Sequence, residues 1–286
     1  MKRVLIAVMA LVAGAAPAAV LAATGSKSKT TTTTTTKPKT TTTTTTTRPK
    51  TTTSTTTTTT TTTTTKPILL GGTVVLGATK TAVVPPTCAP NSGCYVVLTR
   101  VTAIPTIRDG VAYPTKVKVA GSLVALTLGL AKITKTATQT PHQLIAGLDA
   151  SFGGTTQASV TVLKPGPGKN TTRFYSVVAQ SPSFHLQPYL GYVVQFPLAT
   201  PIPVLPGEIV ALTVPTWAPL ISYNLPLKSF AYRQSRKTNC PNTGHFDNAQ
   251  LTIGQGTEYK CDYPGSRLEY NVTEIATPPP PTVYVH

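Results

Sequence analysis

The feature that most constrains the folding of this 286-residue chain is a run of threonine from Thr30 to Thr65. Units of Lys-Pro-Lys and Arg-Pro-Lys interrupt the run, and Lys66-Pro67 closes it. Such a segment has no apolar side chains to bury, so it cannot form a core. Proline fixes φ and β-branched threonine is stiff, which favours an extended coil. We therefore predict that residues 23–67 form a disordered stalk. Three roles suit it: an O-glycosylated stalk, a cationic contact with an anionic envelope, or a plain spacer.

Residues 1–22 have the organisation of a secretory signal peptide. Lys2 and Arg3 form a positive start, an apolar stretch covers Val4–Val20, and a small-residue cleavage signal ends at Ala22. The alternative is an uncleaved membrane anchor, because the apolar stretch is about long enough to span a bilayer. Glycine and proline within the stretch favour cleavage. We expect a secreted or cell-surface protein that has no stable membrane insertion after cleavage.

Cysteines occur only beyond the stalk, and an even number in an exported chain predicts disulfide bonds. The four residues are Cys88, Cys94, Cys240 and Cys261. Three pairings can be drawn. We favour Cys88–Cys94 together with Cys240–Cys261, because each couple brackets one turn-rich loop. A zinc site would need more closely spaced ligands, such as two cysteines separated by two residues.

Residues 68–277 alternate apolar and polar side chains in the way that is typical of half-buried strands. Turns rich in glycine and proline separate these segments, and one helical turn is expected near 141–148. The strand-like segments are 116–119, 124–130, 157–162, 174–179, 189–196, 208–214 and 268–273. We predict an all-β fold, a single antiparallel β-sandwich of jelly-roll-like type. The proline-rich residues 278–286 are predicted to be a disordered tail.

The order of these parts carries a resemblance. After the leader and the low-complexity segment come a strand opening at 71–77, an early cysteine loop, a Pro-Gly turn within 205–212 and a closing strand at 267–272. This order resembles uncharacterised secreted β-sandwich proteins of actinobacteria, over most of residues 70–276. The resemblance implies export and a jelly-roll-like fold. It implies no active residues, because the shared motifs are structural.

The net charge of +17 is unevenly distributed along the chain. From Ile68 onward, sixteen Lys and Arg residues stand against eight Asp and Glu residues, which leaves +8. A charge of this size favours solubility and weak attraction to anionic surfaces. The sequence lacks the basic helix or the platform of basic and aromatic residues that nucleic-acid binding requires, so we expect no nucleic-acid partner.

Catalytic patterns are missing from the sequence. Its acidic residues form no acid-x-acid pair of the kind that a glycosidase strand usually presents. His245 and Asp247 place two metal-ligating types in one loop without a third. Nucleophile-elbow, phosphate-loop and dinucleotide motifs do not occur. We assign no catalytic, cofactor-binding or metal-binding residues and expect a non-enzymatic protein. An extracellular hydrolase of carbohydrates that uses Glu258 and a second acid stays open as the alternative.

Aromatic and basic residues gather in a proline-rich stretch that follows residue 214. Aromatic rings in loops can stack on sugars, and guanidinium groups bind anions. We predict that this group binds an anionic glycan or a cell-wall polymer: Trp217, Tyr223, Tyr232, Arg233 and Arg236. The alternative is structural, with the rings packed over one end of the sandwich beside a solvated basic loop.

Overall fold

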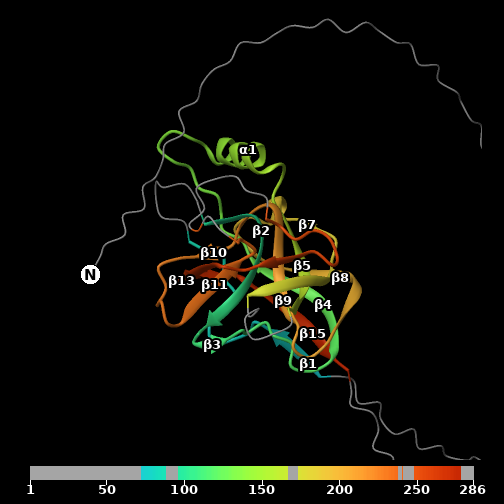
Figure 1. The fold of residues 1–286 in the computed structure, drawn as a ribbon. Coiled ribbons are helices and arrows are strands. Elements are labelled where there is room, and N and C mark those ends of the chain that lie inside the picture. The colour runs from blue at the N-terminus through green and yellow to red at the C-terminus, as the bar shows by residue number, and fades with distance from the viewer. Residues whose placement is uncertain (1–71, 88–95, 167–172, 238–239, 241–247, 278–286) are drawn as a thin grey trace, which may run out of the picture. The chain divides into compact units, whose positions relative to one another are not determined.

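The computed structural model describes residues 72–87, 96–166, 173–237, 240 and 248–277 (Figure 1). These ranges all belong to the unit Thr64–His286. The predicted signal peptide, the stalk and the C-terminal tail lie outside the described residues, as do Cys88 and Cys94.

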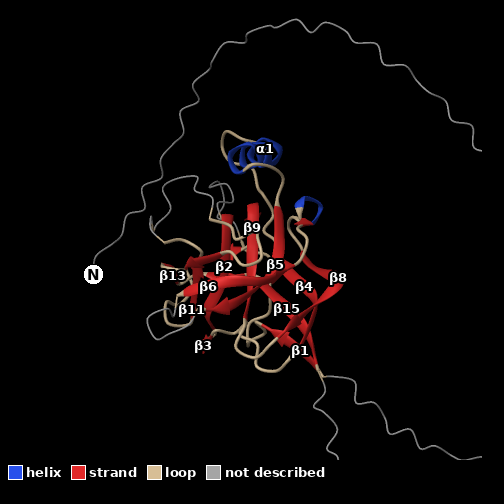
Figure 2. Cartoon of the chain, turned by 45° about the vertical axis from the view of Figure 1, so that its right-hand side comes forward, coloured by secondary structure: helices blue, strands red, loops and turns tan. Residues whose placement is uncertain are grey.

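Strands dominate the described residues, with one α-helix and one short 3-10 helix (Figure 2). The helical elements are α1 (Pro141–Phe152) and η1 (Gln187–Tyr189). The strands are β1 (Thr73–Leu76), β2 (Val97–Arg108), β3 (Val111–Ala112), β4 (Gly121–Gly129), β5 (Gln157–Pro165), β6 (Phe174–Gln180), β7 (Phe184–His185), β8 (Val193–Val204), β9 (Ile209–Pro219), β10 (Ile221–Ser222), β11 (Phe230–Gln234), β12 (Gly256–Glu258), β13 (Cys261–Pro264), β14 (Arg267–Leu268) and β15 (Tyr270–Ala276).

The strands form an antiparallel β-sandwich, which confirms the predicted fold class. The smaller sheet has the order β1-β15-β4-β8, and the larger follows β12-β6-β5-β9-β2-β11-β13. Strands β3 and β7 add to the larger sheet at β2 and β5, while β10 and β14 pair with each other. Every pair of named strands is antiparallel.

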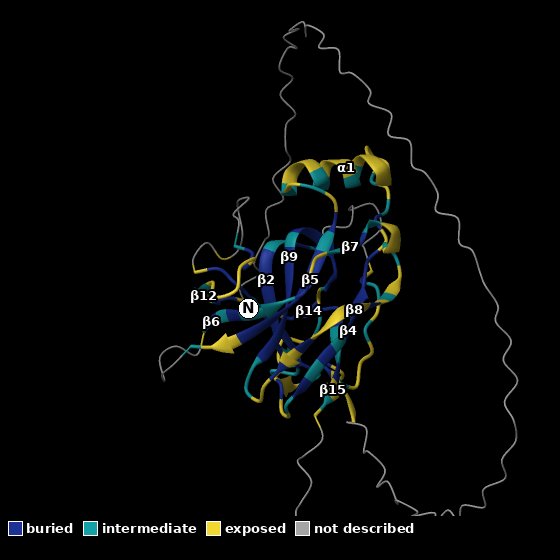
Figure 3. Ribbon diagram, turned by 90° about the vertical axis from the view of Figure 1, so that its right-hand side faces the viewer, coloured by how far each residue is buried: buried dark blue, intermediate teal, exposed yellow. Residues whose placement is uncertain are grey.

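The main core lies between the inward faces of β4, β5, β9 and β15. Alternate residues of these strands are fully buried, as Leu126, Leu128, Val160, Val162 and Leu212 illustrate. Figure 3 shows much of β9 in the dark blue of buried residues, whereas β4 and β15 also carry stretches of intermediate exposure. The period-two pattern of the sequence identified the core-facing residues of β4, β5 and β15.

The outer face of the larger sheet carries a buried row of threonine hydroxyls. Thr213 on β9 shares hydrogen bonds with Thr102 on β2 (2.8 Å) and Thr161 on β5 (2.6 Å). Gln250 covers this row, since its backbone N–H donates to Thr102 and its side chain accepts from Tyr259. A cross-strand ladder of this kind satisfies polar groups that would otherwise be costly to bury.

Helix α1 begins and ends with clear local signals. Thr140 caps the first turn through a reciprocal arrangement with Gln143, and Pro141 occupies the first turn. Gly153 ends the helix with φ of 82°. The predicted helical turn near 141–148 is confirmed and extends to Phe152. The helix lies beyond the ends of β5 and β9, and none of its residues is buried (Figures 2 and 3).

Two predicted strands differ from the structure. Residues 116–119 form no strand, although Lys116 makes an isolated bridge to Ile209, because the chain here only crosses from β3 to β4. Residues 189–196 begin as the end of η1, and β8 starts at Val193. The alternation of 116–119 reflects Val117 pointing into the core while its neighbours are exposed.

The two edges of the smaller sheet are protected unequally. Edge strand β8 contains Pro197, Pro201 and Pro203, which cannot donate to an added strand. Edge strand β1 has the sequence Thr-Val-Val-Leu and contains neither proline nor charge. The surface beside β1 is therefore the less guarded edge of this sheet.

Candidate functional site

The structure separates Trp217 from the other four residues of the predicted binding group. Trp217 lies within β9 rather than in a loop, and its side chain is 0% exposed. Its Nε1 donates a 2.8 Å hydrogen bond to Asp149 Oδ1 of α1. Trp217 also forms a small cluster with Ala131 and Ile133, against which Leu144 and Leu148 of the helix pack. The expectation of an exposed loop aromatic is corrected here: the helix covers this ring.

Tyr232 and Arg236 face inward, whereas Tyr223 reaches the surface. Tyr232 on β11 is 1% exposed and Arg236, just beyond that strand, is 2% exposed, while Tyr223 is 44% exposed. The expectation that the basic residues form a solvated loop is therefore incorrect for Arg236. Arg233 is half-buried, and its Nε lies 3.5 Å from Asp262 Oδ1 on the neighbouring strand β13.

A tyrosine on β13 completes a cluster that the sequence did not identify. The rings of Tyr232 and Tyr263 stack with centroids 4.9 Å apart and an interplanar angle of 12°. Gln234 bridges their hydroxyls: it accepts from Tyr263 (3.2 Å) and donates to Tyr232 (3.3 Å). Burial, together with neighbouring Tyr263, raises the pKa of Tyr223 to about 12. Tyr223 is nevertheless 44% exposed, so it forms the surface side of the same cluster.

Arg236 is the unusual member of this group, which we name the Arg236–tyrosine cluster (Tyr223, Tyr232, Gln234, Arg236 and Tyr263). Its Nε and Nη1 atoms are buried and have no protein acceptor within hydrogen-bonding distance. Burial lowers the pKa of Arg236, and the phenols of Tyr263 and Tyr232 act in the opposite direction. A guanidinium remains charged at neutral pH even so. The cluster therefore contains a buried cation with donors that no described residue uses.

The disulfide Cys240–Cys261 closes the chain next to this cluster, as the favoured pairing predicted. Its Cα atoms are 5.4 Å apart. Cys261 pairs in register with Gln234 across β13 and β11, and the Lys260 N–H donates to the Arg236 carbonyl at 3.0 Å. The covalent bond thus anchors the segment that follows Arg236 to the strand on which Tyr263 lies.

Arg108, another buried arginine at the end of β2, uses both terminal nitrogens of its guanidinium in hydrogen bonds to the backbone. Its guanidinium donates to the carbonyls of Gly77 (2.5 Å), Tyr270 (2.8 Å) and Leu268. Burial and the charge of Arg267 lower the pKa of Arg108 to about 10. Because its donors serve backbone carbonyls, Arg108 fixes the chain after β1 against β14 and β15.

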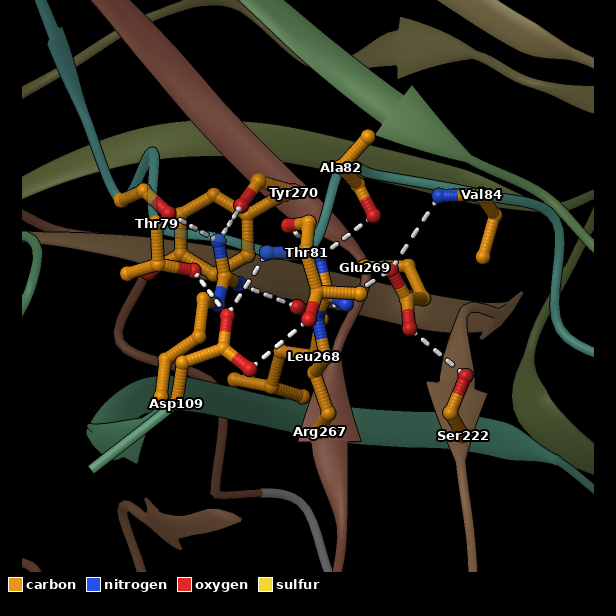
Figure 4. A network of polar contacts seen from close by, with 12 residues as sticks. Thr79, Thr81, Ala82, Val84, Asp109, Ser222, Arg267, Leu268, Glu269 and Tyr270 are labelled. Carbon is orange, nitrogen blue, oxygen red and sulfur yellow. Dashed lines mark hydrogen bonds and ion pairs between the residues drawn. The ribbon is translucent and has the colours of Figure 1, made fainter. Parts of the chain in front are cut away.

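Residues 79–84 form a strap that charged side chains hold in place (Figure 4). Asp109 accepts hydrogen bonds from the hydroxyls of Thr79 (2.6 Å) and Thr81 (2.7 Å). Arg267 donates to the carbonyls of Thr81 and Ala82 and lies 3.4 Å from Glu269 Oε2. These contacts are structural, since the carboxylate of Asp109 and the guanidinium of Arg267 are both used to hold the strap.

Glu269 ends this network at β10. It accepts from Ser222 at 2.6 Å and from the Val84 N–H at 3.3 Å. Burial raises the pKa of Glu269, although Ser222, Arg267 and the Val84 N–H act against that rise. The carboxyl is 1% exposed, so it has no open side toward a substrate.

The remaining acids do not assemble into a catalytic pair in the contacts observed. Glu258 forms a 2.9 Å ion pair with Lys260, and Glu208 accepts from the Leu205 N–H. Glu274 is buried without a protein partner and is considered below. His245 and Asp247 lie outside the described residues. Among the described residues, no three His, Cys, Asp or Glu side chains are grouped to hold a metal ion.

The described ranges include no helix with the length and apolarity needed to cross a membrane. Comparisons with protein-family profiles, with characterised proteins and with solved structures find no match for this chain. The resemblance to secreted actinobacterial sandwich proteins therefore stays a prediction, and function must be argued from the Arg236–tyrosine cluster and its surroundings.

Proposed function

We propose that this protein is an exported, non-enzymatic β-sandwich that binds an anionic polymer, such as an acidic glycan or a cell-wall polymer, at the Arg236–tyrosine cluster. The observation that carries the proposal is the buried Arg236 guanidinium, whose Nε and Nη1 have no acceptor among the residues that the structure describes. An unpaired buried charge is costly, and an anion that supplies acceptors removes the cost. Guanidinium groups are well suited to this role because they bind carboxylates and phosphates in a bidentate manner.

The surroundings of Arg236 support a polymer rather than a small free ion. Tyr223 offers a partly exposed ring on which a sugar can stack, and a phenol hydroxyl that can hydrogen-bond to the sugar. The net charge of +8 from Ile68 onward attracts polyanions over longer distances. Export is supported by the apolar leader and by the disulfide at Cys240–Cys261, which persists in oxidising compartments.

The test measures binding of the full-length protein to three immobilised polymers: polygalacturonate, poly(glycerol phosphate) and neutral dextran. The Arg236→Met variant keeps the length of the side chain and removes its charge. We expect it to lose at least tenfold in affinity for one of the acidic polymers. The matched control is Lys237→Met, which removes the same charge from the exposed neighbouring residue and should change affinity by about twofold.

Two outcomes contradict the proposal. Equal losses in the two variants would show that the basic surface attracts polyanions without a site. A counter-charge for Arg236 from within the chain would also contradict it, and Asp247→Asn tests this possibility. In that case Asp247→Asn and Arg236→Met would lower the melting temperature equally and non-additively, while polymer binding stayed unchanged.

A further inference from the structure

A second pocket lies beside the unguarded edge strand β1, separate from the Arg236–tyrosine cluster in residues and in chemistry. Its volume is about 310 Å³, at the lower end of the range for ligand pockets. Strand β1 forms one wall, while β3 and the connection from Tyr113 to Val119 form the other. We name it the Glu274 pocket, because that residue contributes its only acidic side chain.

Glu274 is an unpaired buried acid. The residue is 0% exposed, and within the described part of the chain neither carboxylate oxygen has a partner at hydrogen-bonding distance. It lies on β15, opposite Val74 of β1 and Leu123 of β4. Space for its side chain depends on Gly121, since a Cβ at that position would lie 2.5 Å from Glu274 Oε1. The fold accommodates this carboxyl without satisfying it.

Stability alone does not explain such a residue. A buried carboxyl without hydrogen bonds loses its hydration without a compensating interaction. An apolar side chain of similar size at this position would make the folded protein more stable. Burial raises the pKa of Glu274, as expected for a carboxyl that lacks a cation. Groups that are unfavourable for folding are commonly retained where they serve binding.

The other residues that line the pocket include apolar valines and cationic lysines. Its walls include the partly exposed valines Val74, Val111 and Val119, which are 37%, 49% and 44% exposed. Lys116 and Lys118 also line it, and both are exposed to solvent. The pocket therefore presents a buried acid, apolar walls and solvent-facing cations.

We propose that the Glu274 pocket binds a small zwitterionic ligand with a primary ammonium at one end, an apolar stem and a carboxylate at the other end. The ammonium pairs with Glu274, which supplies the hydrogen bonds and the charge that the carboxyl lacks. The stem covers the valines, and the carboxylate lies near Lys116 and Lys118. Since no hydrogen bond from a described residue restrains the Glu274 carboxyl, its side chain can turn toward the ammonium without breaking a hydrogen bond.

The test is a calorimetric titration of the full-length protein with 6-aminohexanoate. Two probes act as controls: 6-acetamidohexanoate lacks the ammonium charge, and hexylamine lacks the carboxylate. We expect binding by 6-aminohexanoate, no detectable binding by the acetylated probe, and at least fivefold weaker binding by hexylamine. Methyl signals of the pocket valines should shift in NMR spectra on binding, which locates the ligand.

Variants separate this site from the rest of the molecule. Glu274→Gln is isosteric and should weaken 6-aminohexanoate binding at least tenfold while leaving the binding of acidic polymers unchanged. The control Glu258→Gln neutralises an exposed carboxyl and should have no effect on the amine. Lys116→Met with Lys118→Met should weaken 6-aminohexanoate but not hexylamine. Absence of binding to the wild type at millimolar concentration, or equal binding to wild type and Glu274→Gln, overturns the proposal.

Discussion

Trp217 and Asp149 connect the sandwich to its one α-helix: the indole N–H of the buried Trp217 donates to the Asp149 carboxylate across 2.8 Å. The helix buries none of its own residues, so this bond and the packing of its apolar side chains against the cluster of Ala131, Ile133 and Trp217 hold it in place. A residue that resembled an exposed sugar-binding aromatic is instead the anchor of α1.

We predict that Asp149→Ala destabilises the protein by about 1–3 kcal/mol, because it leaves a buried indole N–H without an acceptor. Trp217 is the only tryptophan of the chain, so its fluorescence reports directly on this contact. Urea unfolding followed by Trp217 emission gives the measurement, and the emission should also shift to longer wavelength. Asp149→Asn keeps an acceptor and should remain close to wild type. Equal stability of all three proteins would show that the hydrogen bond contributes nothing.

Arg108→Met should cost about 3 kcal/mol or more, because three backbone carbonyls lose their donor at a buried position. The same loss should follow from Arg108→Lys, since a single ammonium cannot reproduce the planar guanidinium. Arg173→Met, at an exposed position, is the control and should stay within about 0.5 kcal/mol of wild type. Chemical denaturation at neutral pH distinguishes the three.

Asp109 should contribute stability that is lost on acidification. Burial acts to raise the pKa of Asp109, but hydrogen bonds from Thr79 and Thr81 outweigh it and lower the pKa below its ordinary value of 3.8. A depressed native pKa means that the contribution is present above the unfolded value and disappears as pH falls through the native one. Asparagine tolerates the positive φ of 50° at position 109, so Asp109→Asn removes the charge without straining the backbone. This variant should be less stable than wild type at pH 7. The difference in melting temperature should shrink below about pH 4, and a constant difference would contradict this account.

Glu274→Leu should raise the melting temperature by roughly 2–4 °C, because it replaces an unpaired buried carboxyl by an apolar side chain. Burial holds the pKa of Glu274 above its ordinary value of 4.5, so the native state binds the proton more tightly than the unfolded state. Stability then falls as pH rises from the unfolded to the native pKa. Glu274→Gln should remove this part of the pH dependence, which thermal unfolding from pH 4 to pH 8 would reveal.

Replacement of Cys240 and Cys261 by serine should destabilise the protein by about 3 kcal/mol, given the sequence separation of 21 residues. The same change should weaken polymer binding, because the disulfide tethers the segment that follows Arg236 to β13. Denaturation with and without reductant provides the stability measurement. Binding that survives in the serine variant would separate the Arg236–tyrosine cluster from the disulfide.

Local patterns predicted the larger part of the fold. The alternation in 157–162 and 268–273 identified strands and their buried faces, because side-chain direction in a strand depends only on position along it. The turn at Asp109 and Gly110 and the end of α1 at Gly153 follow from residues that tolerate positive φ. The pairing of Cys240 with Cys261 followed from the short loop between them.

The candidate sites depended on contacts between distant parts of the chain. Some features depend only on neighbouring residues: the threonine run, the leader and the alternation of the strands. The sequence by itself was therefore enough to predict a stalk and to determine the β-sandwich class of the fold. Contacts between distant segments do not follow from such local patterns. Strand β11 lies between β2 and β13, and this placement buries Tyr232 and stacks it on Tyr263. It also leaves Arg236 Nε and Nη1 without an acceptor among the described residues. In the same way, pairing of β1 with β15 placed Glu274 beside a pocket. Only the tertiary structure decided these encounters, because strand order is set by packing of the whole core and not by any local pattern.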